Sequence, residues 1–407
     1  MGVQTMQRLA IDGGEPVRRA PFHPWPIWDE REEQALSRTL RSGVWGIGGE
    51  ETELFEREFA AAHGVRHALT VPTGTAALEA ALRACGVTYG DEVIVPSYTF
   101  VATAAAALLI GAVPLFADID PQRYTMDPAT VESLITERTR AIVPVHIGGY
   151  PADMDALLTI ARRHRLWVVE DACQAVGARW RGRMAGAHGD IGTFSFQSSK
   201  NINSGEGGAV ITDSDELARR CWSFKNCGRS PDGVWYQHDT LGDNFRMSQF
   251  QGALLRAQLS RMEEWAERRA ANGAYLSAGL LAVGGIAPQP EDERVTRHGY
   301  HLMIGRYDGE EFGGWPRARF LAALQAEGVP CSRGYVPIYA TSGVRDGIVQ
   351  LACALGRGEP AAPHCPIAEH ACAEEAVWIG SQSALLGTTE DMDDIIAAVA
   401  KIKAATR

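Results

Sequence analysis

The stretch GTFSFQSSKNINSGEGG, residues 192–208, lies at the centre of this chain, and Lys200 is its most informative residue. Only four of the 39 basic residues are lysines, yet one of them stands in a loop of serine, asparagine and glycine. A lysine amine can lose its proton and attack a carbonyl, whereas a guanidinium stays charged. Lys200 is therefore a candidate for Schiff-base chemistry, and the alternative is an ordinary loop lysine.

Outward from this stretch, short apolar runs alternate with helical patterns between residues 65 and 212. The candidate strands are 67–71, 92–96, 113–118, 141–146, 167–172, 191–196 and 209–212. Helical runs between them include 75–85, 102–110 and 154–165. Apolar strands joined by crossover helices predict a mostly parallel α/β sheet covered on both faces. Ligands of such sheets bind beyond the carboxyl ends of the strands.

The rest of the chain predicts a second, smaller domain. Further helical patterns cover 30–42, 248–281, 317–327 and 391–404, and a strand-like run covers 300–306. A chain of 407 residues with 45% hydrophobic residues is long enough for two domains. We expect a large α/β domain with an N-terminal arm over residues 1–262, and a smaller α+β domain over residues 263–407.

The composition excludes several classes of function. A net charge of −11 argues against nucleic acid or an anionic membrane as a partner. The N-terminus lacks the apolar core of a signal peptide, and the apolar run 100–117 is interrupted by glycine and proline, as expected for a buried helix and strand. Eight cysteines without paired spacing predict reduced thiols in a cytoplasmic protein. The histidines and cysteines of 364–372 match no common zinc spacing, so no metal is expected. The glycine-rich loop 43–49 lacks a dinucleotide fingerprint.

Polar groups follow several of the predicted strands. Thr73-Gly74-Thr75 leads into a helix whose free N–H groups could bind a phosphate, the alternative being a capped helix start. Phe100 follows the second strand and could cover a flat ring, although aromatic residues at strand ends usually belong to the core. Ser195 ends the sixth strand and could add a hydroxyl to a phosphate site.

Asp171 closes the fifth predicted strand after a strongly apolar run. An unpaired buried carboxylate is costly, and a protonated pyridine nitrogen is a suitable partner for it, the alternative being a helix cap or a surface carboxylate. The order of phosphate turn, aromatic, carboxylate, serine and lysine at successive strand ends supplies every group that a pyridoxal phosphate (PLP) site needs. This order favours a PLP enzyme over an ordinary loop lysine.

At this point the chain, from about Pro24 to Ile402, resembles the DegT/DnrJ/EryC1/StrS family of PLP-dependent aminotransferases, which act on keto-sugars and keto-cyclitols. The motifs that carry the resemblance are TGTAAL (73–78), VIVPSYTFVAT (93–103), VVEDACQAVGA (168–178), FSFQSSKNINSGEGGAV (194–210) and DNFRMSQFQGA (243–253). The resemblance implies a PLP-dependent transferase of fold type I, similar to aspartate aminotransferase, with a large seven-stranded, mostly parallel sheet.

The resemblance also implies roles for individual residues. The matched positions are Lys200 for the Schiff base, Asp171 for the pyridine nitrogen, Gln174 for the phenolic oxygen, Phe100 for ring stacking, and Gly74, Thr75 and Ser195 for the phosphate. Asn244 matches an asparagine that reaches the phosphate from the other subunit, which implies a homodimer with shared active sites. Relatives that act as dehydratases have histidine in place of Lys200, so the lysine indicates transamination.

The acceptor is indicated by a few further residues. Gln197, the N-terminal LAIDGGEPVRRAPFHPWP (9–26) and CysGlyArg at 227–229 resemble the branch acting on carbocyclic ketones, such as scyllo-inosose aminotransferases and aminohydroxybenzoate synthases. We therefore predict ping-pong transfer of an amino group from glutamine or glutamate to a keto-cyclitol, in amino-cyclitol or antibiotic biosynthesis, with Lys200 as the proton shuttle.

Two alternatives stay open. The sequence WIGSQSALL (378–386) lacks the histidine that the cyclitol branch tends to have, so a UDP- or dTDP-linked keto-sugar could be the acceptor instead. A more remote alternative is a PLP-fold protein that binds an aminated sugar without turnover.

Overall fold

A seven-stranded sheet forms the centre of the computed structural model, which describes residues 8–234, 236–358 and 361–406. The spatial order of its strands is β1 (His67–Val71), β9 (Gly208–Thr212), β8 (Ile191–Ser195), β5 (Trp167–Asp171), β4 (Thr139–Ile142), β2 (Glu92–Pro96) and β3 (Val113–Ala117). β9 runs antiparallel to both of its neighbours, whereas the pairs from β8 to β3 are parallel. The predicted large, mostly parallel sheet is therefore confirmed.

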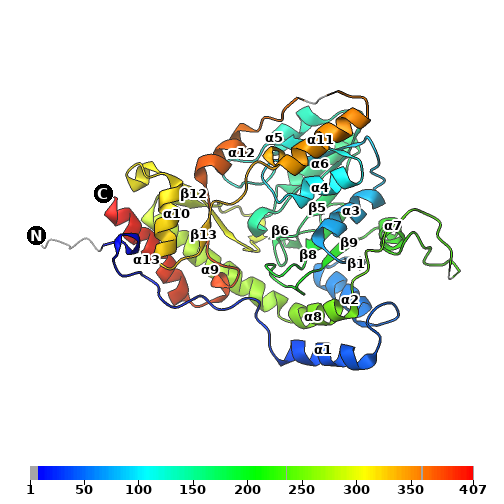
Figure 1. Ribbon diagram of the computed structural model, residues 1–407, viewed down its shortest axis with the longest axis horizontal. Coiled ribbons are helices and arrows are strands. Elements are labelled where there is room, and N and C mark those ends of the chain that lie inside the picture. Colours follow the sequence, from blue (N-terminus) through cyan, green and yellow to red (C-terminus); the bar gives the residue numbers. More distant parts are fainter. Residues whose placement is uncertain (1–7, 235, 359–360, 407) are drawn as a thin grey trace, which may run out of the picture.

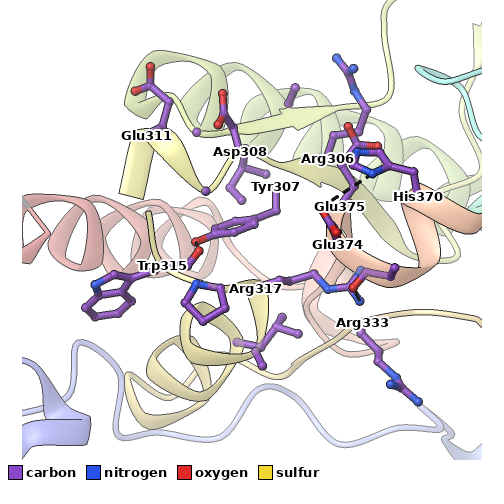
Figure 2. A pocket seen from close by; sticks show the side chains of 18 of the residues that line it. Arg306, Tyr307, Asp308, Glu311, Trp315, Arg317, Arg333, His370, Glu374 and Glu375 are labelled. Carbon is purple, nitrogen blue, oxygen red and sulfur yellow. Dashed lines mark hydrogen bonds and ion pairs between the residues drawn. The ribbon is translucent and has the colours of Figure 1, made fainter. Parts of the chain in front are cut away.

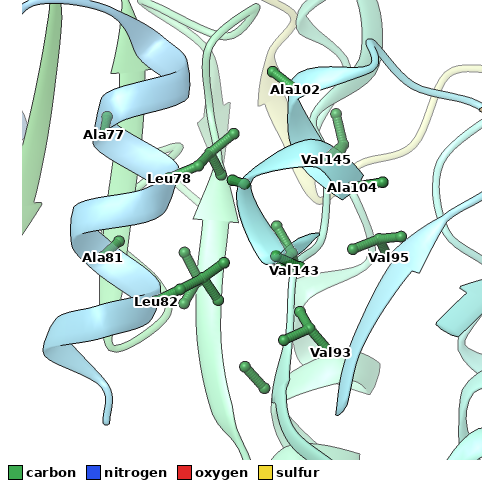
Figure 3. Close-up of a cluster of buried hydrophobic side chains, with 14 of the residues drawn as sticks. Ala77, Leu78, Ala81, Leu82, Val93, Val95, Ala102, Ala104, Val143 and Val145 are labelled. Atoms are coloured by element: carbon green, nitrogen blue, oxygen red, sulfur yellow. The ribbon is translucent and has the colours of Figure 1, made fainter. Parts of the chain in front are cut away.

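Helices flank this sheet (Figure 1), and the apolar side chains between the helices and the strands are buried. The crossover helices include α3 (Gly74–Ala84), α4 (Ala102–Leu109) and α6 (Met154–His164). Figure 3 shows Leu78 and Leu82 of α3 in a cluster with valines of β2 and of the segment around β4. Both leucines are buried, and burying such a side chain contributes about 1.5–3 kcal/mol. This packing fixes the start of α3 against the carboxyl edge of the sheet.

A second sheet is antiparallel and has a core of its own. Its strand order is β10 (Ile286–Pro288), β12 (Met303–Tyr307), β14 (Ala376–Ile379) and β13 (Cys331–Ser332). The helices beside it are α9 (Met262–Val283), α10 (Arg317–Ala326) and α13 (Thr389–Ala405). The N-terminal segment lies along α13, where Arg18 forms ion pairs with Asp391 at 2.7 Å and Asp394 at 2.8 Å (Figure 1).

The remaining elements complete the two layers and a small third sheet. They are α1 (Glu30–Ser42), α2 (Glu51–His63), α5 (Pro128–Val131), α7 (Asp215–Lys225), α8 (Gln249–Leu259), α11 (Ser342–Ala354), α12 (Pro366–His370), β6 (Arg179–Trp180), β7 (Arg183–Met184) and β11 (Val295–Arg297). The boundary between the two predicted domains, at residues 262 and 263, stays a prediction. Residues 1–7 and 407, at the outer ends of these two domains, lie outside the described part of the chain. Among the described residues, no helix combines the length and apolarity that crossing a bilayer requires.

Three predicted elements differ from the structure for local reasons. The helix predicted over 248–281 is two helices, because the Ser260 hydroxyl donates to the Ala257 carbonyl at 2.7 Å and competes with the helical backbone. The strand predicted over 300–306 begins at Met303, because Tyr300 has a φ of 40°, which an extended strand cannot contain. β4 ends at Ile142 because the nearby Pro144 has no N–H for the ladder.

Candidate active site

A cavity of about 770 Å³ lies at the carboxyl edge of the large sheet and is closed on its far side by residues of the second sheet. Seven of the eight predicted site residues line it: Gly74, Thr75, Phe100, Asp171, Gln174, Ser195 and Lys200. The motifs that carry them are separated in sequence by up to 126 residues, and the strand ends bring them together. Asn244 is the exception, since it lines a different cavity.

The Lys200 loop is held by hydrogen bonds of its own backbone. Ser198 N donates to the Gly205 carbonyl at 2.9 Å, and Lys200 N donates to the Gln197 carbonyl at 2.8 Å. The side-chain amide of Gln197 also holds the loop. Its Oε1 accepts from Ser199 N at 2.9 Å, and its Nε2 donates to the Ser198 hydroxyl at 2.8 Å. The side chain of Gln197 therefore shapes the loop that carries the lysine.

Lys200 differs from the other three lysines in its partners. Each of the others forms an ion pair with a glutamate, at 2.8 Å for Lys225, 2.8 Å for Lys401 and 2.6 Å for Lys403. Among the described residues, no carboxylate or carbonyl bonds the Lys200 amine. Burial lowers the pKa of Lys200, and the nearby Cys173 and Asp171 oppose this shift. The amine is thus less firmly protonated than that of a surface lysine, and it is free to react.

Asp171 ends β5 and faces the same cavity, where it is 6% exposed. Its Oδ2 accepts a hydrogen bond from the Thr103 hydroxyl at 2.8 Å, and its Oδ1 accepts from Cys173 N at 3.2 Å. No basic side chain of the described residues pairs with it. Because a buried carboxylate without a cation is costly, Asp171 is suited to a positively charged ligand atom.

Glu170, the neighbouring carboxylate, points to the other face of the sheet, as alternation along a strand requires. It lies 2.9 Å from the buried His146 ring and accepts from the backbone N–H groups of Gly186, His188 and Gly189. Burial opposes ionisation, but these bonds prevail and the pKa of Glu170 is lowered. Glu170 therefore has its own partners and serves the structure, which leaves Asp171 as the carboxylate of the cavity.

The N-terminus of α3 and Ser195 meet at another side of the cavity. The Thr73 hydroxyl caps the helix by accepting from Ala76 N at 3.1 Å. A Cβ on Gly74 would lie 2.7 Å from Cβ of Ser195 and 3.0 Å from Sγ of Cys173, so only glycine allows this close approach. The arrangement joins free backbone N–H groups with a hydroxyl, and such a site binds anions.

Two other predicted residues lie near Tyr335. Gln174 accepts from Gly148 N at 2.7 Å and donates to the Tyr335 hydroxyl at 2.9 Å. The Phe100 ring lies 6.4 Å from the Tyr335 ring and is 53% exposed, which leaves part of it uncovered at the cavity.

Asn244 lies in a separate cavity of about 490 Å³, near Lys225 and the exposed loop that contains Trp45 and Ile47. Within one protomer it does not join the seven other residues.

The sequence-based reasoning missed four residues that shape the site: Thr103, His301, Tyr335 and Trp378. Thr103 has a local signal, because Thr99 precedes it by one helical turn and their hydroxyls lie 3.0 Å apart. Tyr335 has none, since the Gln174 side chain that it bonds is 161 positions away.

A larger cavity, of about 1010 Å³, lies beside β10, β12 and α10 (Figure 2). It contains none of the predicted site residues. Its most buried charge is Arg317, whose guanidinium donates to four backbone carbonyls at 2.6 to 3.1 Å.

Comparisons with known proteins agree with this geometry. The sequence pattern of the DegT/DnrJ/EryC1/StrS aminotransferase family matches residues 26–400. The L-glutamine:2-deoxy-scyllo-inosose aminotransferase of Streptoalloteichus tenebrarius is 41% identical over 418 residues, covering 97% of both chains. The 3-amino-5-hydroxybenzoate synthase of Amycolatopsis mediterranei is 38% identical over 380 residues, covering 92% of this chain and 96% of the relative.

A solved structure shows the same fold. The crystal structure of 3-amino-5-hydroxybenzoic acid synthase superposes with a TM-score of 0.85 at 36% identity, covering 94% of this chain and 99% of that chain. The family match spans both sheets, and the relatives are matched along nearly their whole length. The protein belongs to the DegT/DnrJ/EryC1/StrS aminotransferase family, as its motifs predicted.

Proposed function

We propose that this aminotransferase uses PLP to move an amino group from glutamine to a keto-cyclitol of the scyllo-inosose class. One observation carries the proposal: Lys200 and Asp171, a lysine without an ion pair and a carboxylate without a cation, line the same cavity. Each lacks the partner that its charge requires, and a single flat ligand with an aldehyde and a basic ring nitrogen would supply both partners.

The residue types that line the cavity match the chemical groups of PLP. Those that would hold it are Lys200 at the aldehyde carbon, Asp171 at the ring nitrogen, Gln174 at the phenolic oxygen, Phe100 over the ring face, and Gly74, Thr75 and Ser195 at the phosphate. The close approach of α3 at Gly74 provides the anion site that a phosphate needs. When bound, the cofactor supplies an electron-accepting ring next to the reacting carbon.

The side chains then divide the work of proton transfer. Lys200, once its amine is released, removes the proton from the α-carbon of glutamine and later returns a proton to the acceptor carbon. Its lowered pKa favours the uncharged amine that the first of these steps requires. Asp171, held in place by Thr103, stabilises the proton on the ring nitrogen.

The relatives and the cavity wall together support a cyclitol acceptor. The Streptoalloteichus relative is named for glutamine and 2-deoxy-scyllo-inosose. The wall formed by the second sheet presents Ser332, Ser381 and Gln382 to the cavity. These hydroxyl and amide groups can both donate and accept hydrogen bonds, which suits a ring that carries several hydroxyls.

We also propose a homodimer in which Asn244 of one protomer reaches the Lys200 cavity of its partner. Asn244 does not line that cavity within its own protomer. The surface near it exposes large apolar side chains, with Ile47 71% and Trp45 52% exposed. Apolar side chains gathered on a surface are typical of an interaction site.

The test follows the nitrogen atom. The wild type and Lys200→Ala are incubated with PLP, glutamine labelled with ¹⁵N at its α-amine, and 2-deoxy-scyllo-inosose. The wild type should release a ¹⁵N-amino-cyclitol, and Lys200→Ala should lose at least about 10³-fold of this activity. Glutamate and UDP- or dTDP-linked keto-sugars are the comparison substrates. Amination of the nucleotide-linked ketones alone would refute the cyclitol proposal, and turnover by Lys200→Ala would refute the role of the lysine.

A further inference from the structure

The segment from His298 to Leu302 reaches the Lys200 cavity in a strained conformation. Tyr300 has a φ of 40°, a left-handed value that is unusual for a bulky residue. The segment is tied to the short turn Ile147–Gly149 that follows β4, because Gly299 N donates to the Gly149 carbonyl at 2.8 Å and Leu302 N donates to the Gly148 carbonyl at 3.2 Å. Strain of this kind persists only where the surroundings impose it, and it concentrates at functional sites.

The surroundings of Tyr300 are built for this conformation. Its ring stacks on the His298 ring, with centroids 3.7 Å apart. On the other side α9 has a glycine, Gly273, where a Cβ would lie 2.5 Å from the Tyr300 ring. The packing therefore selects the strained backbone, and this backbone determines where the next residue, His301, is placed.

His301 lies in the wall of the Lys200 cavity and is 5% exposed. Its Nδ1 is buried and bonds none of the described residues. Because the ring lines the cavity while Nδ1 is buried, the ring edge that reaches the cavity is the opposite one, which carries Nε2. A buried polar atom without a partner costs about 1–3 kcal/mol, so Nδ1 does not stabilise the fold, whereas the other edge of the ring can reach a group in the cavity.

Arg269 of α9 lies behind His301 and is 1% exposed. Its Nη1 donates to the Tyr300 carbonyl at 3.3 Å, whereas its Nε and Nη2 lack partners among the described residues. Burial lowers the pKa of Arg269 to about 9, which leaves it a cation at neutral pH. The guanidinium also lies over the Trp25 ring, 5.4 Å from its centroid, and its positive charge lowers the pKa of His301.

Asn201, the residue after Lys200, completes this group. Its Nδ2 donates to the Gly299 carbonyl at 2.8 Å, while its Oδ1 is buried without a partner. Asn201 and Arg269 line one internal void that has no room for a water molecule. The unpartnered N–H groups of Arg269 and the unpartnered Oδ1 of Asn201 therefore border the same void, and both residues hold the segment before His301 through the Tyr300 and Gly299 carbonyls.

This arrangement determines the protonation of His301. Nδ1 has no acceptor among the described residues, and a buried N–H without an acceptor is costly, so the single proton of the neutral ring is favoured on Nε2, which can find a partner in the cavity. Burial, together with the charges of Lys200 and Arg269, lowers the pKa of His301 well below its usual value. The Nε2–H group is therefore a neutral donor directed into the cavity. Among the described residues no side chain bonds Nε2, so this N–H is available to an oxygen of the bound ligand.

We propose that His301 is a further catalytic residue, which donates a hydrogen bond from Nε2 to an oxygen of the cyclic ketone next to the reacting carbon, and that Arg269 and Asn201 are its positioning residues. This inference rests on the proposed function for the identity of the acceptor. The protonation state of His301 follows from the fold alone and is measured separately.

The first experiment observes the ring directly. The full-length chain is labelled with ¹⁵N-histidine, and the His301 signals are assigned by their loss in His301→Gln. Between about pH 6 and pH 8, where an ordinary histidine titrates, we expect the shifts of a neutral ring protonated at Nε2. Arg269→Met should raise the pKa of His301, because it removes a nearby positive charge. A ring that becomes charged in this range in the wild type, or one protonated at Nδ1, would overturn the proposal.

The second experiment separates the two half-reactions by single-turnover kinetics. In His301→Leu, we expect the rate with the cyclic ketone to fall about 10-fold through loss of one hydrogen bond, while the rate with glutamine changes less than about 3-fold. His301→Gln keeps a donor and should recover part of the ketone rate. Equal losses in both half-reactions would mean that His301 acts through Lys200, which refutes the substrate contact. A wild type that aminates no cyclic ketone refutes the proposed function instead, and the NMR result then still decides the state of His301.

Discussion

Two cavities of this protein, of about 1010 and 770 Å³, differ in the charged residues that they bring together. The larger one, beside α10, contains Arg317, which donates to four carbonyls, and Glu375, which accepts from the Tyr124 hydroxyl at 3.0 Å (Figure 2). The smaller one contains Lys200 and Asp171, which form no ion pair with each other or with any other described residue, although the Asp171 charge is near enough to oppose the lowering of the Lys200 pKa. Arg306 of the larger cavity also has a buried Nε without a partner, so the proposed active site is distinguished by a lysine and a carboxylate that converge on one cavity, and not by volume.

The largest effect on activity is expected from Asp171→Asn. An amide cannot stabilise a proton on a ring nitrogen as a carboxylate does, so we expect kcat to fall about 10²- to 10³-fold. The matched control is Glu374→Gln in the larger cavity, where the carboxylate lies 3.8 Å from an exposed His370. Steady-state kinetics should show less than about a 2-fold change for the control. Equal decreases in kcat for Asp171→Asn and Glu374→Gln would contradict the proposal that catalysis takes place in the smaller cavity.

Arg317→Met tests the same distinction through stability. The substitution leaves four backbone carbonyls without their donor, and we expect the free energy of unfolding to fall by about 3 kcal/mol. Urea unfolding measures this, with the exposed Arg319→Met as the control. Activity at a temperature where both variants are folded should match the wild type. A variant that is stable but inactive would make the larger cavity part of the catalytic machinery.

A smaller effect is expected from Thr103→Val, which removes the hydroxyl that holds Asp171. The loss of one hydrogen bond to a charged group costs about 1.5–3 kcal/mol, which predicts a decrease in kcat of at least about 10-fold. Thr99→Val, one turn earlier, removes a hydroxyl that bonds Thr103 but not Asp171, and it should cost less. If Thr99→Val decreased kcat more than Thr103→Val, the Thr103 hydroxyl would not be the group that positions the Asp171 carboxylate.

The smallest effect is a shift in titration. Burial penalises the charged form of Lys200, so its proton leaves at a lower pH than that of an ordinary lysine. In the cofactor-free chain, labelling of Lys200 by an amine reagent should reach its half-maximal rate below pH 10.5, the usual lysine pKa. Because the folded state binds fewer protons than the unfolded state, Lys200 destabilises the fold as the pH decreases below 10.5. Lys200→Met should therefore be more stable than the wild type at pH 8, as measured by urea unfolding.

Local sequence predicted the parts of the site that depend on strand ends. A few neighbouring residues are enough to predict the strand that ends at Asp171 and the glycine turn at Gly74, because burial and turn geometry are local properties. The interruption at Ser260 was missed, because one side-chain hydrogen bond overrides a good helical pattern. The position of His301 in the cavity wall was missed because nothing near it in the sequence indicates that the segment 298–302 reaches Lys200.

The predicted roles of the site residues depend most on where the cofactor becomes attached. The chain is incubated with PLP, reduced with borohydride so that the link between lysine and cofactor is permanent, and digested for mass spectrometry. Only four lysines compete, and three of them are ion-paired in this structure. We predict that the added mass lies on the peptide containing Lys200 and on no other. Labelling of Lys225, Lys401 or Lys403, with Lys200 unmodified, would contradict the account.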